Sequence, residues 1–415
     1  MTKKTLAAVG AGLALAAVLS VPTMAQAAPA PVTPAAVSAA TNDATDPRAQ
    51  LEAFLAQTNL DPALQEKLRA AVAKLPADWQ QRQAALAERF GLDHSAYREI
   101  TQSVINPDDH QCAPTPMRDW ASKSYAAAWK PLFLLTLFGA ADIPTYDALI
   151  FGHEAKTNTF GVDGGITQEM NRTMTSLRRF WDIPKDVELM PMHGRVLSDP
   201  ARVVRAYEVV YGMSREDAEL YAGTVAEILA KYPEANGGDH PYLTFNAFAY
   251  DPQDDPWATE LGITKRIVMG DGIVQAQEGI GLPAAEASRG ILAHEYGHQV
   301  QYAKGLFASP LTGPEATRRT ELMADAMSTY ALVHSRGAAL NAKRTLDVQK
   351  SFFNVGDCGF SSPGHHGTPN QRIRSTEWAA QVVDSAPNQG HKLTGHDFAA
   401  KFDAQLPVIV APDAR

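Results

Sequence analysis

The sequence predicts an α+β protein that is predominantly helical, with a small sheet packed against one central helix. Apolar residues recur at helical spacing along most of the chain, whereas only three short stretches are rich in β-branched or aromatic residues. The central helix contains the run from Ile291 to Val300, in which two histidines lie four residues apart. With 415 residues, the chain is long enough for one large domain or two ordinary ones.

Composition narrows the classes of partner. Hydrophobic residues make up 45% of the chain and charged residues 20%, which is normal for a globular protein. The net charge is −9 and the sequence has no dense block of lysine and arginine. We therefore expect no nucleic-acid partner and no binding to an anionic membrane, and composition leaves the oligomeric state open.

The first 46 residues are interpreted as export signal and linker. Residues 1–27 begin with two lysines, continue with an apolar run from Leu6 to Leu19, and end in Ala25-Gln26-Ala27. This is the pattern of a cleaved signal peptide, and the run is too short for a permanent membrane anchor. Residues 28–46 consist mainly of Ala, Pro, Thr and Ser, which predicts a flexible linker. We expect an exported protein, either periplasmic or extracellular.

Both cysteines, Cys112 and Cys358, lie after the predicted signal peptide. In an oxidising compartment the simplest interpretation is one disulfide bond between them. Two buried free thiols are the alternative.

Residues 47–130 are predicted to form an N-terminal helical region, followed by a larger domain at residues 131–415. Apolar residues from Leu51 onward follow helical spacing, Asp61-Pro62 has the form of a helix start, and another helix is expected from Asp78 to Phe90. This region is either a packed accessory lobe or a pro-region that shields a site.

The larger domain is expected to begin with the buried apolar segment Pro131 to Phe138. The expected strands are Val187–Met190, Tyr242–Tyr250 and Ile263–Met269. The expected helices cover Gln168–Phe180, start at Pro200 and after Ser214, start at Pro283, and run from Thr312 to Gly337, with at least one more after Cys358.

The run His294-Glu295-Tyr296-Gly297-His298 predicts a zinc site. Residues four apart lie on one face of a helix, so the imidazoles of His294 and His298 can reach a single ion. Glu295 lies beside that ion, where a zinc-bound water needs a base. A surface helix that carries this string by chance is the alternative.

A catalytic zinc ion normally has three protein ligands, so one more is needed. Gln301 and Lys304 stand where the metzincin pattern requires glycine and histidine, which excludes that class. Glu321 and Asp325 share a face of the following predicted helix, among apolar neighbours. We expect Glu321 to be the third ligand and Asp325 to orient a histidine from behind.

These motifs resemble those of the gluzincin-type zinc metallopeptidases, in particular bacterial neutral zinc metallopeptidases and the soluble catalytic core of Ste24-like peptidases. Asn246-Ala247-Phe248-Ala249 is similar to the family's substrate-binding edge strand, and Glu321 to Asp325 to its third-ligand motif. His366 to Ile373 resembles its His-Pro…Arg-Ile segment, although Gly367 replaces the proline. The resemblance covers about residues 242–373 and includes no membrane helices.

The resemblance implies a zincin-like core, one Zn²⁺ per chain, and a peptide or protein substrate that pairs with Asn246, Ala247 and Phe248. Glu295 is then the general base, and His365 or His366 stabilises the oxyanion. Arg372 either shares that role or pairs with a buried carboxylate such as Asp325. A Cys112–Cys358 disulfide would hold the loop that carries the two histidines.

Two other functions remain open at this point. One is a zincin-fold binding module without proteolysis, and the other is a metallohydrolase that acts on non-peptide cell-wall material. The sequence contains no Gly-x-Ser-x-Gly nucleophile motif, which argues against a serine hydrolase.

Overall fold

The computed structural model describes residues 46–89, 111, 115–155, 158–253, 255–357 and 365–413. The predicted signal peptide and, apart from Asp46, the predicted linker lie outside these ranges. Cys112 and Cys358 also lie outside them, and with them the predicted disulfide bond.

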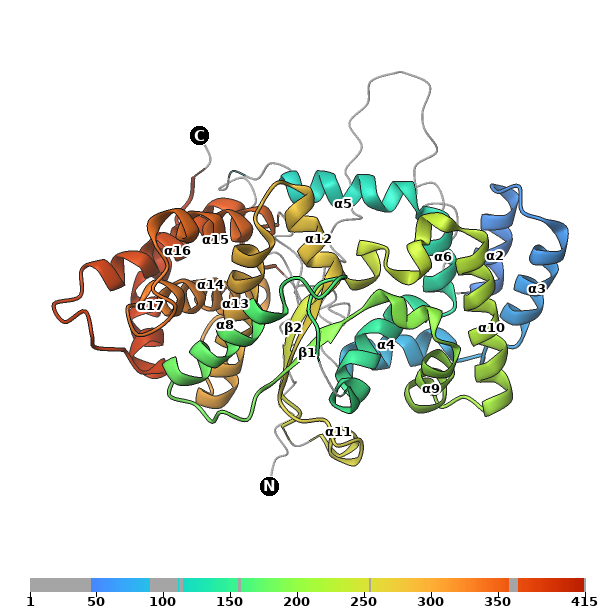
Figure 1. Ribbon diagram of the computed structural model, residues 1–415, viewed down its shortest axis with the longest axis horizontal. Helices are drawn as coiled ribbons and strands as arrows, with labels where there is room; N and C mark the ends of the chain where they lie inside the picture. Colours follow the sequence, from blue (N-terminus) through green and yellow to red (C-terminus); the bar gives the residue numbers. More distant parts are fainter. Residues whose placement is uncertain are drawn as a thin grey trace, which may run out of the picture.

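The described chain is predominantly helical and contains one three-stranded sheet, as the sequence predicts. The strands are β1 (Glu188–Met192), β2 (Ala247–Tyr250) and β3 (Arg266–Gly270). Their order is β1-β3-β2, with β1 parallel and β2 antiparallel to β3. The sheet lies between two groups of helices (Figure 1).

The second predicted strand is the one that differs most from its expected length. Only its last four residues form β2, because Pro241–Thr244 adopt a 3₁₀ turn that the His240 side chain caps at the Tyr242 amide. The aromatic residues of this stretch favour a strand, but Pro241 fixes φ and lacks an amide donor for the ladder.

The first lobe, on the right in Figure 1, is formed by helices that come both before and after β1 in the sequence. They are α2 (Pro47–Ala56), α3 (Pro62–Ala73), α4 (Trp79–Arg89), α6 (Trp129–Leu137), α9 (Pro200–Tyr211) and α10 (Arg215–Lys231). Asp46, Asp61 and Asp199 cap the helices that begin with proline, because each carboxylate accepts the orphan amides of the first turn.

The core of the first lobe continues across residue 130, the predicted domain boundary. Phe54 of α2 is fully buried and stacks on Phe133 of α6, with ring centroids 4.8 Å apart. Trp79 is also buried and donates from Nε1 to the carbonyl of Leu137 at 3.1 Å. The helices before residue 90 therefore share one hydrophobic core with α6, α9 and α10.

The second lobe, on the left in Figure 1, is built around the helix that carries the two histidines. Its helices are α8 (Thr167–Phe180), α13 (Ala284–Lys304), α14 (Gly313–Val333), α15 (Ala342–Asn354), α16 (Pro369–Asp384) and α17 (Gly395–Ile409). All except α15 begin or lie where the sequence predicts a helix. The aromatic rings of Trp181, Tyr330 and Phe398 pack together in this core.

Shorter elements connect the lobes and the sheet. They are α5 (Pro116–Ala127), α7 (Ile143–Tyr146), α11 (Pro256–Glu260), α12 (Asp271–Gly279), a π-turn at Asp147–Phe151, and 3₁₀ turns at Ala140–Asp142, Gly152–Glu154, Gly194–Ser198, Pro233–Gly238 and Pro241–Thr244. Within the described ranges no single helix is long and apolar enough to cross a membrane, although the bent pair Trp129–Leu137 and Ala140–Glu154 passes by length and composition.

Candidate metal centre

The helix α13 presents His294 and His298 one turn apart in the interior of the second lobe. It begins after Pro283, has Glu286 in its first turn, and ends at Gly305, whose φ of +64° is the left-handed conformation that favours glycine. Both histidine side chains are buried, at 1% exposed each. A buried pair of imidazoles needs partners, because an unpaired polar group loses its hydration.

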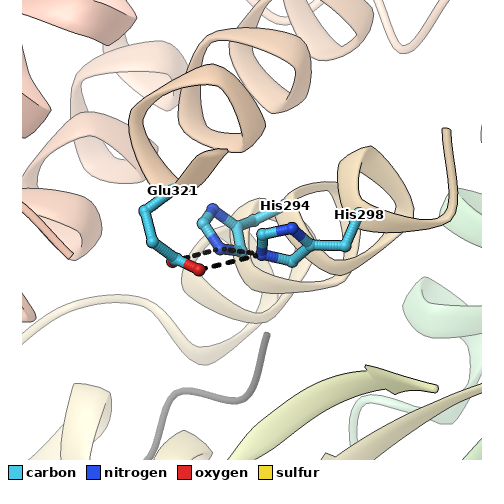
Figure 2. A group of neighbouring side chains, drawn as sticks. All are labelled: His294, His298 and Glu321. Carbon is cyan, nitrogen blue, oxygen red and sulfur yellow. Dashed lines mark hydrogen bonds and ion pairs between the residues drawn. The ribbon is translucent and has the colours of Figure 1, made fainter. Parts of the chain in front are cut away.

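The helix α14 crosses α13 closely enough to bring a carboxylate to the two imidazoles. A Cβ atom built on Gly297 would lie 3.2 Å from Cα of Ala324, so glycine at this position allows the close approach of the two backbones. Glu321, three residues before Ala324 on α14, consequently faces His294 and His298 and is itself buried. Figure 2 shows the three side chains converging from the two helices.

The distances within this group match those between ligands of one small ion. The two imidazole Nε2 atoms are 3.1 Å apart, and Glu321 oxygens lie 3.3 Å from His294 Nε2 and 3.4 Å from His298 Nε2. Ligand atoms about 2.0–2.1 Å from a tetrahedral zinc ion are separated by about 3.3–3.4 Å. Within the described ranges, no other group of three His, Cys, Asp or Glu residues converges in this way.

Hydrogen bonds behind the histidines fix which ring nitrogen faces the group. Nδ1 of His294 donates to Asp325 Oδ1 at 2.8 Å. Nδ1 of His298 donates to Gln301 Oε1 at 2.8 Å, and Gln301 Nε2 donates to the carbonyl of Thr320, which sets the orientation of the amide. With both Nδ1 atoms used as donors, the two Nε2 atoms turn toward each other, and a proton or a metal cation between them stabilises this arrangement.

Burial and the neighbouring charged groups shift the pKa values of these residues. Burial alone would lower the pKa of His294, but its bonds to Asp325 and Glu321 outweigh burial and raise the pKa to about 10. Burial lowers the pKa of His298 to about 4, against the opposing charge of Glu321. Burial would raise the pKa of Glu321, but the neighbouring His366, His298 and His294 lower it. The donor set therefore holds either a proton or a metal cation, and two imidazoles with a carboxylate suit zinc.

Glu295 is fully buried beside this group, and neither of its carboxylate oxygens has a hydrogen-bond partner among the residues that the structure describes. Burial raises its pKa well above the usual range, and the charge of His294 opposes this only in part. The backbone amide of Ala249 approaches Glu295 and favours its charged form, although it does not complete a hydrogen bond. A buried carboxyl group without a partner is the kind of group that a bound reactant can satisfy.

Asp325 connects His294 to Arg372 in a line of buried charges. The Arg372 guanidinium donates to both Asp325 oxygens, from Nε at 2.7 Å and from Nη2 at 2.6 Å. Both side chains are 0% exposed. The sequence leaves two roles open for Arg372, a share in oxyanion stabilisation or a pairing with a buried carboxylate such as Asp325. The structure shows the pairing with Asp325.

Of the two loop histidines, His366 faces the group and His365 is directed at a neighbouring carboxylate. Nε2 of His366 lies 3.7 Å from Glu321 Oε2. Nδ1 of His365 donates to Asp357 Oδ1 at 2.7 Å, and the backbone amide of His366 donates to Asp357 Oδ2 at 2.7 Å. Burial opposes the shift, but Glu321 and Asp357 raise the pKa of His366.

The strand β2 lies at the edge of the sheet and packs against α13. The Gly270 amide donates to the Asn246 carbonyl at 3.0 Å, so Asn246 and Phe248 direct their backbone groups toward β3. By alternation, Ala247 and Ala249 direct theirs away from β3, toward the outer edge of the described sheet, where both residues are buried. Asn246, Ala247 and Phe248 are the residues expected to pair with a peptide, but of these only Ala247 directs its backbone groups away from β3. Ala249, which is not among them, has the same orientation as Ala247.

Three polar residues near the group have no assigned role in the sequence interpretation. Gln301 lies one turn after His298, and this spacing is a signal that was available. Gln299 anchors α13 to the sheet by donating to the carbonyls of Tyr250 and Arg266 at 3.0 Å each. Asp357 lies eight and nine residues before its two histidine partners in a loop, where no periodicity points to the contact.

Comparison with known proteins finds no matching family model, no matching curated protein and no matching solved structure.

Proposed function

We propose that this protein is an exported zinc-dependent endopeptidase of the gluzincin type, with a zincin-like core formed by the sheet, α13 and α14. One observation carries the proposal: His294 and His298 direct Nε2 atoms 3.1 Å apart toward a shared point that Glu321 also faces. The partnerless Glu295 beside that point supports a hydrolytic role over a purely structural metal.

Zinc bound here supplies Lewis acidity, which lowers the pKa of a water molecule to about 7 and polarises a carbonyl group. The charge of a bound zinc ion would oppose the effect of burial on the pKa of Glu295 and favour its ionised form. The Glu295 carboxylate then takes a proton from the attacking water and passes it to the leaving amine. His366 donates from Nε2 to the oxygen of the attacked carbonyl as negative charge develops there. Asp357 holds the loop backbone at His366 in this position.

The peptide is proposed to pair antiparallel with the outer edge of β2, the edge that faces away from β3. Backbone groups of Ala247 and Ala249 then bond to the substrate main chain. The approach of the Ala249 amide to Glu295 brings the strand and the base to the same peptide bond. Main-chain pairing selects an extended polypeptide and not a particular side chain, which is consistent with an endopeptidase.

The test pairs zinc content with hydrolysis of an unstructured protein substrate, for the native chain and for Glu295→Gln. We expect about one zinc ion per chain in both proteins and a loss of activity of about 10²–10⁴-fold in the variant. The control is Glu377→Gln on α16, which changes an exposed glutamate and should retain both properties.

Three results would contradict the proposal in different ways. A native chain that holds no zinc removes the metal site itself. Zinc bound without cleavage of any protein supports a binding module, and cleavage of cell-wall material alone supports the non-peptide hydrolase. Unchanged turnover in Glu295→Gln removes the proposed base.

A further inference from the structure

The second lobe has a groove, lined mainly by polar and charged residues, on the outward side of α8. Its volume is about 550 Å³, and its walls are α8 and the turn after α14. One face of α8, which includes Met174 and Leu177, is buried in the core of the lobe. The groove lies on the opposite face of the helix. The lining residues are Gln168, Asn171, Arg172, Thr175, Ser176, Arg179, Arg336 and Gly337.

The groove is positively charged in a protein whose net charge is −9. Arg172, Arg179 and Arg336 line it, and the lining includes no aspartate or glutamate. All three arginines are exposed. Neither Arg172 nor Arg179 makes a side-chain hydrogen bond or ion pair to any residue of the described ranges, so their donors are available to a ligand.

Helix stability does not account for this charge. Basic residues at the end of a helix usually compensate its dipole and its unpaired carbonyls. At the end of α8, however, Lys392 Nζ already donates to the carbonyls of Arg179 and Phe180. Glu169, the one acidic residue of α8, forms an ion pair with Arg289 and so is not available to neutralise the groove.

We propose that this groove binds an acidic segment of a polypeptide in extended conformation. From Gln168 to Arg179 the helix rises by about 16 Å, which matches about five residues of extended chain. Guanidinium groups pair with carboxylates, and the amides of Gln168 and Asn171 can both donate to and accept from peptide groups.

A nucleic acid fits the groove less well than a peptide. The lining has no aromatic side chain on which a base can stack. The net charge of −9 also repels a long polyanion at distances beyond the groove, whereas a short acidic segment is affected less. This site is separate from the metal centre, and its binding does not depend on peptide cleavage.

The experiment is fluorescence anisotropy with a dye-labelled hexaglutamate peptide at low salt. The native chain should bind the peptide, and added salt should weaken binding because exposed charges are screened. Arg172→Glu/Arg179→Glu should bind roughly tenfold more weakly or worse, since two attractions become two repulsions. Arg172→Gln/Arg179→Gln should show a smaller loss in the same direction, and Glu295→Gln should bind like the native chain.

The matched control is Lys343→Glu/Lys350→Glu on α15. Both lysines are exposed and neither lines the groove, so this variant changes the net charge equally and should bind within about twofold of the native chain. An equal loss in this control, or no binding to the native chain, would overturn the proposal. Equal binding of a six-nucleotide oligothymidylate would overturn the assignment to a polypeptide.

Discussion

The two lobes bury polar groups in different ways. In the first lobe, Tyr207 and Tyr211 are buried and donate their hydroxyl groups to the carbonyls of Phe138 and Gly139, at 2.9 Å each. Their rings pack against each other and against Trp79, Tyr146 and Tyr221, and burial raises the pKa of Tyr207 and Tyr211 well above the usual range, so both stay neutral. In the second lobe, a continuous line of ionisable groups runs through the core from Glu321 through His294 and Asp325 to Arg372.

This difference is the one expected if the second lobe holds the proposed metal site and the first lobe mainly supplies stability. Neutral tyrosines with satisfied hydroxyls add apolar area to a core without the cost of burying charge. Buried ion pairs are weak evidence for stability, because desolvation offsets most of their attraction. A core that keeps them in spite of this cost is expected where the charges orient a metal ligand, which is the role we propose for Asp325 and Arg372 behind His294.

The largest effect is expected from replacing Arg372, which lies at the opposite end of this line of ionisable groups from Glu321. Arg372→Met leaves Asp325 buried without its cation, which should lower the free energy of unfolding by about 3–5 kcal/mol. It should also weaken zinc binding by about 10–100-fold, because Asp325 no longer holds His294 in one orientation. Urea unfolding of the metal-free chain measures the first quantity, and competition with a zinc chelator measures the second.

Trp79→Ala is the control from the first lobe. Truncating this buried ring should cost about 3–5 kcal/mol of stability, similar to Arg372→Met, with no change in zinc affinity. The exposed pair Arg69 and Glu52 offers a second control, in which Arg69→Met should change neither quantity measurably. If Trp79→Ala weakens zinc binding as much as Arg372→Met does, the distinction between the lobes is wrong.

The parts of the site that follow helical spacing could be predicted from the sequence. His294 and His298 are four residues apart on α13, and Glu321 and Asp325 are four apart on α14, so local periodicity placed each pair on one face. Cap signals at Asp61, Asp199 and Ser214 located three helix starts for the same reason, since each depends on contacts within one turn.

The parts that depend on contacts between distant segments could not be predicted in this way. The role of Asp357 requires a loop to fold back onto His365 and His366, and no local pattern specifies that path. The shorter β2 depends on Pro241 and on the register with β3, which decides that the backbone of Ala249 and not that of Phe248 faces the outer edge of the sheet. The groove on α8 depends on Arg336, which lies more than 150 residues away in sequence.

A smaller effect is expected when the two loop histidines, His365 and His366, are replaced one at a time. His366→Ala removes the imidazole that faces Glu321, and should lower kcat by about 10²–10³-fold with little change in KM or zinc content. His365→Ala removes an imidazole that donates to Asp357 and does not face Glu321 in the same way, and should have a clearly smaller effect on kcat. Steady-state kinetics of both variants on one unstructured protein substrate compares them. The reverse order of effects would assign the oxyanion role to His365.

The smallest effect is expected for the pH dependence of zinc binding, because the ion must replace a proton on His294. In the metal-free chain the pKa of His294 is about 10, so at pH 7 its folded form carries a proton that the unfolded chain, with a pKa of about 6.5, mostly releases. This contribution to stability is complete below pH 6.5 and is lost as the pH rises through 10. His298, with a pKa of about 4, has no proton to lose at pH 7.

Zinc must displace the His294 proton, so its affinity should rise by about tenfold per pH unit between pH 7 and 9. Isothermal titration calorimetry in buffers of different ionisation enthalpy should then report release of about one proton per zinc ion at pH 7. Asp325→Asn removes the carboxylate that accepts from Nδ1 of His294 and stabilises its charged ring, so the variant should lower the pKa of His294 and flatten the slope. A zinc affinity that is independent of pH in the native chain would show that His294 is already neutral, and that the charged line ends at Asp325 instead of reaching the metal.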